Sequence, residues 1–196
     1  MAFSGFNTNT AKKLLLDAGA FVKDFEPETD TWATVKDTKV IGATQGGGSF
    51  SAVPTMRRIE IDGVKGAAKG LEALDEWVVT ITANVKEISA EALALALASS
   101  KNAAAGTPED YNKITANNEI ALTDYLKNIT WIGKLSGSDK PVIILVKNAL
   151  CTNGLSLTMA DKAEGTISLT FTGHYDPEQL DSPPFEIYYP EVAGDA

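Results

Sequence analysis

The clearest feature of the chain is a strict alternation of apolar and polar positions over residues 76–87 and again over residues 165–175. A period of two is typical of a β-strand that buries one face. The apolar positions of these two predicted strands are Trp77, Val79, Ile81, Ala83 and Val85, and then Ile167, Leu169 and Phe171. The polar positions on the opposite faces are Thr80, Thr82, Asn84 and Lys86, and then Thr166, Ser168, Thr170 and Thr172.

Weaker patterns predict further extended segments between runs of turn-forming residues. We expect strands at residues 32–35, 57–62, 124–135, 141–150 and 154–159, and a hairpin over residues 13–25. The segment 154–159 is expected to pair with residues 165–175. Residues 99–110 are small and turn-forming, which predicts a loop.

Only residues 89–99 have the character of a helix. Ser89 is a favourable N-cap, and Glu91 places a negative charge in the first turn, where the helix dipole favours it. Leucines alternate here as in a strand, but alanine is the strongest helix former and is depleted in strands. The sequence therefore predicts a mainly β protein with one α-helix at about residues 89–99.

Residues 40–63, VIGATQGGGSFSAVPTMRRIEIDG, combine consecutive glycines with apolar side chains. The glycines leave the backbone unconstrained. A segment of this kind either folds onto its own core or docks on another subunit. We expect residues 44–56 to form a contact loop, fixed to a sheet by a strand over residues 57–62. The residues expected in this contact are Gly46, Gly47, Gly48, Phe50, Val53 and Pro54.

Charge is concentrated at the C-terminal end. The net charge is -9, and residues 176–196 contain six acidic residues and no Lys or Arg, so residues 1–175 carry only -9 + 6 = -3. Neither part has the basic surplus that binding to phosphates requires, which argues against tight nucleic-acid binding and against adhesion to an anionic membrane. The same acidic segment holds four prolines and one apolar island, residues 185–189. We expect this island, with Phe185 and Tyr188, to form an edge strand or to clamp a neighbouring molecule.

The sequence offers little chemistry. Cys151 is the only cysteine, so an intramolecular disulfide and a multi-cysteine zinc site are excluded, and folding in a reducing, intracellular compartment is expected. His174 is the only histidine and belongs to no nucleophile or metal-ligand motif. The glycine run lacks the phosphate-loop spacing. The longest apolar run is far shorter than a membrane span. We expect no catalytic residue, no cofactor and no metal.

Several extended pieces lack an evident partner within the chain: an N-terminal arm (residues 1–12), the glycine-rich segment and the aromatic island. Exposed strands and apolar arms are aggregation hazards in a monomer, and identical neighbours cover them in a closed ring. This combination predicts assembly.

Three runs of residues carry a resemblance to a known family: IGATQGGGSFSAVPTMRRIEIDG, KGLEALDEWVVTITANVKEISAEALALALA and VKNALCTNGLSLTMADKAEGTISLTFTGHYDP. They resemble the major tail (tail tube) proteins of long-tailed bacteriophages, especially those of Gram-positive hosts. The resemblance spans residues 17–188. Its most specific parts are the glycine-rich approach to a Pro-x-x-Arg-Arg-x-Glu-x-Asp-Gly strand and the segment ADKAEG…FTGHYDP.

The resemblance implies an antiparallel β-sandwich or barrel with one flanking helix, in which residues 13–175 form the tube domain between an N-terminal arm (1–12) and an acidic C-terminal arm (176–196). Six copies would form a ring, and stacked rings would form the tail tube of a virion that is assembled in the host cytoplasm. The partners would be other copies and the tape measure, tail terminator and distal tail proteins. Double-stranded DNA would pass without specific binding, and no membrane is involved.

On this interpretation the loop 44–56 reaches a neighbouring subunit or ring, and a neutral or mildly acidic polar face lines the lumen, because low friction for a polyanion requires it. Alternation alone does not decide which polar face points inward. The lumen candidates are Thr80, Thr82, Asn84, Thr166, Ser168, Thr170 and Thr172. The alternative is a stand-alone β-sandwich whose glycine-rich loop binds a small molecule or a carbohydrate. An enzyme ranks third, for want of suitable residues.

Overall fold

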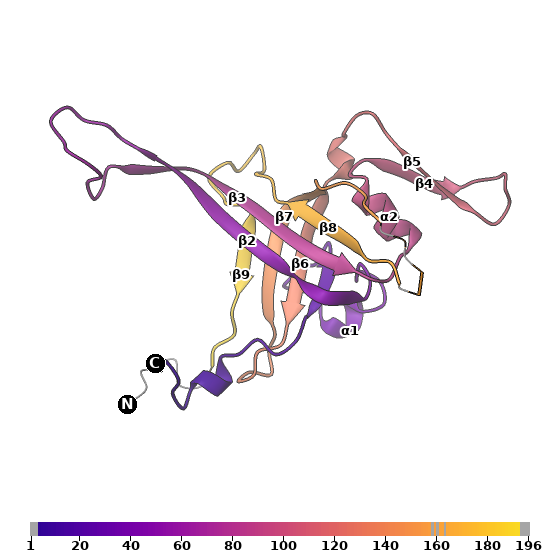
Figure 1. Cartoon of the computed structure of the whole chain (residues 1–196), viewed down its shortest axis with the longest axis horizontal. Helices are drawn as coiled ribbons and strands as arrows, with labels where there is room; N and C mark the ends of the chain where they lie inside the picture. Colours follow the sequence, from indigo (N-terminus) through magenta and orange to yellow (C-terminus); the bar gives the residue numbers. More distant parts are fainter. Residues whose placement is uncertain (1–3, 158, 160, 163, 193–196) are drawn as a thin grey trace.

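Two antiparallel β-sheets pack face to face and share one strand (Figure 1). The structure is a computed structural model, and it describes residues 4–157, 159, 161–162 and 164–192. The first sheet contains β1 (Ala20–Lys23), β6 (Leu126–Gly133), the first part of β7 (Val142–Cys151) and β9 (Phe185–Tyr188). The second contains β2 (Thr44–Arg58), β3 (Glu72–Val85), β8 (Ile167–Thr172) and the end of β7. The fold is therefore a mainly β, antiparallel sandwich, as the sequence predicts.

Strand β7 joins the two layers. It pairs with β6 and β9 along its first part, and its last residues, Leu150 and Cys151, pair with Thr172 and Phe171 of β8. Just before this change of partner, Asn148 has a φ of 46°. Asparagine tolerates this left-handed conformation better than most residues, so it suits the bend that carries one strand from sheet to sheet.

The core lies between the sheets and confirms the predicted inward faces of residues 76–87 and 165–175. Strands β3 and β8 bury every second side chain, and these side chains meet those of the opposite sheet. The central members of this cluster, all at most 1% exposed, are Phe21, Val79, Ile81, Ala83, Val85, Ile129, Val146, Ile167, Leu169 and Phe171.

The predicted helix is present as α2 (Ala90–Ala96). The side chain of Ser89 accepts a hydrogen bond from the backbone N–H of Ala92 at 3.0 Å, so the predicted N-cap is confirmed. Ala92 and Ala96 are buried. A second helix, α1 (Trp32–Val35), replaces the strand predicted at residues 32–35. That prediction was wrong because Thr31 and Thr34 exchange capping hydrogen bonds, which stabilise a single turn.

Residues 99–110 are not a loop throughout. They contain β4 (Ser100–Ala104), which pairs with β5 (Asn112–Ala116) in a separate hairpin beside α2 (Figure 1). Their alanine, asparagine and lysine are weak strand formers, so the pairing leaves no signal in local propensity. Short 3-10 turns occupy η1 (Thr10–Lys12) and η2 (Leu122–Asp124).

The hairpin predicted over residues 13–25 is wrong. β1 pairs with β6, and the leucines before it run along the turn between β6 and β7 instead of folding back onto β1. The N–H of Leu16 donates to the carbonyl of Lys134 at 3.1 Å, and the N–H of Ser136 donates to that of Leu14 at 3.0 Å. The predicted pairing of residues 154–159 with 165–175 is also wrong for the described residues, because β8 pairs with β3 and β7. Residue 158 lies outside the described residues.

The predicted contact loop 44–56 is a strand. β2 pairs with β3 from Thr44 to Arg58, and the strand predicted at residues 57–62 ends at Arg58. The connection between the two strands is formed instead by residues 59–71. Figure 1 shows the β2–β3 hairpin projecting far beyond the sandwich. We call residues 56–74, the projecting part of this hairpin, the arm. It is distinct from the N-terminal arm (1–12) and the acidic C-terminal arm (176–196) that the sequence predicts.

Candidate functional site

The polar faces of β2, β3 and β8 lie side by side on the outer surface of the second sheet. Facing residues of paired strands share one side of a sheet. Thr80 faces Ser51 on one side and Thr172 on the other, and Thr82 faces Ser49 and Thr170. The full set, which we call the polar face, is Ser49, Ser51, Thr80, Thr82, Asn84, Ser168, Thr170 and Thr172.

Side-chain hydrogen bonds connect the polar face across the strands. The hydroxyl oxygens of Thr82 and Thr170 are 2.9 Å apart, and those of Thr152 and Thr172 are 2.8 Å apart. The side chain of Asn153 accepts from the N–H of Thr170 at 2.9 Å. These bonds fix the threonine rotamers and extend the polar surface past β8 to the residues that follow β7.

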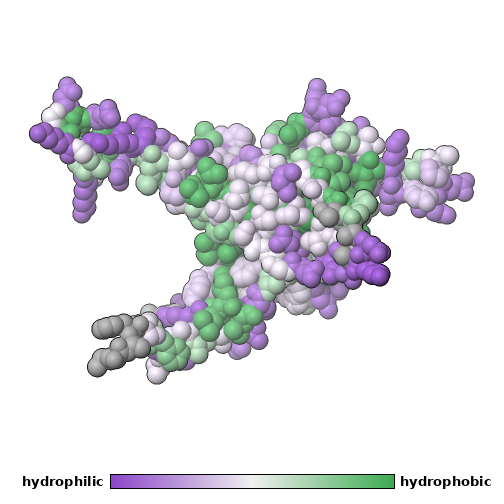
Figure 2. Space-filling model, in the orientation of Figure 1, coloured by the Kyte–Doolittle hydropathy of each residue, from purple (hydrophilic) through white to green (hydrophobic). Residues whose placement is uncertain are grey.

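The polar face carries no charge. Within the described part of the three strands, no Asp, Glu, Lys or Arg projects from it between Val78 and Asn84. The first charges appear at its end, where Lys86 and Glu164 form an ion pair at 3.2 Å. This sheet faces the viewer in Figure 1, and Figure 2 shows a pale surface of near-neutral hydropathy over its middle. Such a surface neither attracts nor strongly repels a polyanion.

The sequence anticipated most of the polar face. Six of its seven lumen candidates lie on it, and Thr166 lies just before β8. The prediction missed Ser49 and Ser51 because β2 was expected to be a loop. Their spacing of two residues, with Phe50 between them, was the available signal for a strand.

The three consecutive glycines form an irregular turn of β2 rather than a free loop. Between Thr44 and Gly48 the pairing with β3 shifts, and Gly46 and Gly47 adopt φ values of 75° and 64°. A Cβ atom on Gly48 would lie 1.9 Å from the carbonyl oxygen of Thr82 and 2.6 Å from the ring of Phe21. The subunit's own packing therefore requires Gly48, and the positive φ values favour glycine at positions 46 and 47.

The other predicted contact residues of β2 point to opposite sides. Phe50 and Pro54 are half-buried on the core side, and Phe50 packs against the core. Val53 faces outward and is 53% exposed. It pairs with Val78, which is also exposed, so the two valines form an apolar patch beside the polar face.

The arm exposes further apolar side chains that have no core of their own. Met56 and Leu74 pair across it and are 62% and 53% exposed. Ile59, Ile61 and Val64 are exposed toward the tip. A two-stranded ribbon is marginally stable in water by itself, and these residues form an exposed apolar surface along it.

The aromatic island behaves in two ways. Phe185 packs inside the subunit, with its ring centroid 5.4 Å from that of Trp77 and 5.9 Å from that of Phe50. Tyr188 is 42% exposed and donates its hydroxyl to Glu186. The Lys147 ammonium and then the Tyr188 hydroxyl hold the pKa of Glu186 below its ordinary value. The island is an edge strand, β9, on β7, which agrees with one of the two predicted alternatives.

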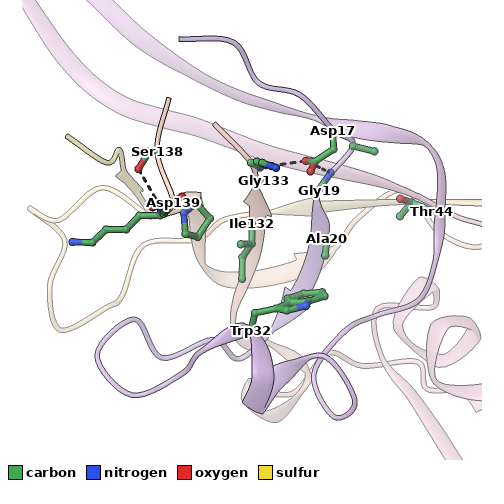
Figure 3. Close-up of a pocket in the computed structure, with 13 residues that line it drawn as sticks. Asp17, Gly19, Ala20, Trp32, Thr44, Ile132, Gly133, Ser138 and Asp139 are labelled. Carbon is green, nitrogen blue, oxygen red and sulfur yellow. Dashed lines mark hydrogen bonds between the residues drawn. The ribbon is translucent and has the colours of Figure 1, made fainter. Parts of the chain in front are cut away.

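A groove with a volume of about 850 Å³ lies between the start of β1 and the turn before β7 (Figure 3). The indole of Trp32, 52% exposed, and Ile132 form its apolar part, with Asp139 at the opposite end. One Asp17 oxygen accepts from the N–H groups of Gly19 and Lys134, both at 3.2 Å, so this carboxylate holds a turn. The groove offers Trp32 as a stacking surface, and its lining includes Ser138, Asp139 and Lys140 but no histidine or cysteine.

His174 and Cys151, the only histidine and the only cysteine, lie in structural surroundings. The ring of His174 stacks edge-on against Tyr125, and its Nδ1 lies 3.0 Å from the carbonyl oxygen of Asn148. Burial raises the pKa of the Cys151 thiol. Arg57 pairs with Asp75 at 2.8 Å across the base of the arm. No cluster of three His, Cys, Asp or Glu suited to a metal occurs in the described residues.

Because comparison with known proteins gives no function, the function has to be inferred from these surfaces. No family model matches the chain, and no curated protein matches it significantly. Across the described residues, the helices are all too short or too polar to cross a lipid bilayer.

Proposed function

We propose that the protein is a structural virion component that assembles into stacked rings and forms the tail tube through which a bacteriophage delivers its DNA. The observation that carries this proposal is the uncharged polar face beside the unpaired edge of β2. In the described part of the chain β2 pairs with β3 alone, so its other edge offers backbone donors and acceptors to a neighbour.

An open edge next to a flat polar face allows sheets of neighbouring subunits to continue one another. Repetition of such a heterologous contact closes a ring when the rotation between copies permits it. Six copies per ring is the number that the resemblance to tail tube proteins implies. The polar face then turns toward the lumen, where an uncharged surface leaves double-stranded DNA free to slide.

The arm supplies a second reason to expect neighbours. The arm projects well beyond the sandwich (Figure 1), and its apolar side chains at Ile59, Ile61 and Val64 are exposed, which favours a contact with another molecule. It takes the role that the sequence assigned to residues 44–56. Further partners of the assembled tube are the tape measure, tail terminator and distal tail proteins.

Negative-stain imaging of the purified protein at rising concentration tests the proposal. Rings or tubes are expected, together with a concentration-dependent increase in sedimentation coefficient. A monomer that persists under every assembly condition contradicts it.

The groove beside Trp32 supports one other function, a stand-alone module that binds a small molecule or carbohydrate. An exposed indole is a suitable stacking surface for a sugar ring. This reading expects a monomer at all concentrations and a change in Trp32 fluorescence on ligand binding, and the same imaging experiment separates the two functions.

A further inference from the structure

A groove with an acidic rim lies where the arm leaves the sandwich. It has a volume of about 420 Å³. Leu74, Trp77, Leu180 and Pro183 form its apolar part. Leu74 and Leu180 are 53% and 67% exposed, so the subunit itself leaves this apolar surface uncovered.

The charges of this groove are all negative. Asp75, Glu76 and Asp181 line it, and no Lys or Arg does. Asp75 is neutralised by Arg57. Glu76 and Asp181 form no ion pair with any described residue, which leaves two uncompensated carboxylates beside exposed leucines. An occupant of matching chemistry would be basic at one end and apolar at the other.

The N-terminal segment of the same chain has this chemistry. Residues 12–16 read Lys-Lys-Leu-Leu-Leu, and Leu14, Leu15 and Leu16 are 48%, 57% and 55% exposed. The segment begins with Lys12 at the end of the 3-10 turn η1, and hydrogen bonds of Leu14 and Leu16 with Ser136 and Lys134 hold it beside the turn between β6 and β7. It is therefore presented in a fixed position with its leucines uncovered.

The two surfaces lie at opposite ends of β9 within one subunit. The groove adjoins Phe185, whose ring contacts Trp77. At the other end of β9, Tyr188 pairs with Ile143 of β7. The residue before Ile143, Val142, packs against Leu135, and Leu135 forms a β-bridge with Leu15 of the leucine segment. β9 alone separates them by about 10 Å, the length of four strand residues. Residues 12–16 of one subunit therefore cannot enter the groove of the same subunit unless they detach from their own position in the fold.

We infer that the acidic groove at the base of the arm receives residues 12–16 of a second copy of this chain. The contact is heterologous, and because its two halves lie at opposite ends of a strand, it repeats along the strand direction. In the proposed tube, the acidic groove and residues 12–16 would be the surfaces that join successive rings, so this inference rests on the proposed function.

Charge exchange tests the pairing. The variant Glu76→Lys/Asp181→Lys and the variant Lys12→Glu should each assemble at a higher concentration than the unmodified chain. Exposed ion pairs change an affinity by about twofold to fivefold each, and the effect multiplies over the contacts between two rings. The chain that carries all three substitutions should recover assembly toward that of the unmodified protein.

Matched controls are Lys101→Glu and Glu109→Lys on the β4–β5 hairpin, which change net charge away from the groove. Sedimentation velocity gives the assembly midpoint, and thermal melts confirm that each variant is folded. A Leu16→Asp variant tests the apolar half of the contact and should also raise the midpoint.

The inference is overturned if the unmodified chain forms tubes and the groove and Lys12 variants assemble like the controls. It is equally overturned if the combined variant is folded and recovers nothing. In both cases the tube function stands. Failure of the unmodified chain to associate overturns the tube function together with this contact.

Discussion

The hydroxyl oxygens of Thr82 and Thr170 lie 2.9 Å apart at the centre of the polar face. Each residue comes from a strand whose other face is buried in the core, so the pair lies directly over the packed interior of the protein. In the proposed tube, a lining made of such pairs would hold its hydroxyl groups in hydrogen bonds to one another, which would reduce their availability to a passing phosphate backbone.

The energetic coupling of this pair is measurable. Thr82→Val and Thr170→Val should each lower the free energy of unfolding by about 1 kcal/mol, and the double variant by little more than either alone. Both residues are half-buried, so water compensates part of each loss. Urea denaturation of the four proteins gives the coupling energy, and strictly additive effects would show that the two hydroxyls do not interact.

Labelling determines which surface faces the lumen. Ser168→Cys places a thiol on the polar face, and the native Cys151 is buried and 3% exposed. A maleimide on a large polyethylene glycol should label Ser168→Cys quickly in unassembled protein and slowly in tubes, whereas a small maleimide labels both. The matched control Lys101→Cys should react equally in both states. Equal polymer labelling of Ser168→Cys in tubes would place the polar face outside.

The arm should be needed for assembly and dispensable for folding. Replacing residues 59–71 with Asn-Gly closes the hairpin with a tight turn and keeps the Arg57–Asp75 ion pair. The free energy of unfolding should change by less than about 1 kcal/mol, because an isolated ribbon adds little stability. Tube formation in negative stain should be lost. Tubes of normal length from the shortened chain would contradict the role of the arm.

Two neighbouring glycines should respond differently to alanine. Gly48→Ala should cost about 3 kcal/mol, because its Cβ collides with the backbone of β3, which cannot yield. Gly46→Ala meets no atom within 4 Å but keeps a φ of 75°, so it should cost only about 1 to 2 kcal/mol. Gly5→Ala is the control, with open space around it. Thermal denaturation orders the three, and a harmless Gly48→Ala would mean that β2 does not approach β3 as described.

Glu186 should contribute to stability only above acidic pH. Its pKa is lowered in the folded protein by Lys147 and then Tyr188. A group with a depressed folded pKa stabilises the fold above its unfolded pKa, about 4.3, and the contribution is lost as pH falls through the folded value. The side chain is 40% exposed, so the effect is screened to about 0.5 kcal/mol. Glu186→Gln should therefore be less stable than the unmodified chain at pH 7, and the difference should shrink as the pH falls below the unfolded pKa. A constant difference across this range would contradict the assignment.

The parts of the fold that sequence predicts best are those where burial alone decides the pattern. Strands β3 and β8 have one face on the core and one on water, so their side chains alternate without interruption. The Ser89 cap and the alanine-rich helix follow from local preferences for the same reason.

The errors arise where an irregular backbone or a distant partner decides. The shift in pairing between Thr44 and Gly48 interrupts the period of two, so the sequence predicted a loop where the structure has strand β2. Leu14–16 suited a hairpin by composition, but their hydrogen-bond partners lie about 120 residues later, at Lys134 and Ser136. The acidic groove joins Leu74 to Leu180, a proximity that no local pattern contains.

The shared strand β7 has a mechanical consequence. A pull on the arm is transmitted along β2 and β3, then through the β3–β8 ladder to the end of β7, and from there through β7 itself into the first sheet. The two layers cannot slide past each other unless this covalent link or its hydrogen bonds give way. Load applied at the arm is thereby spread over both sheets, so a filament built from such subunits would flex at the contacts between copies before any subunit deforms.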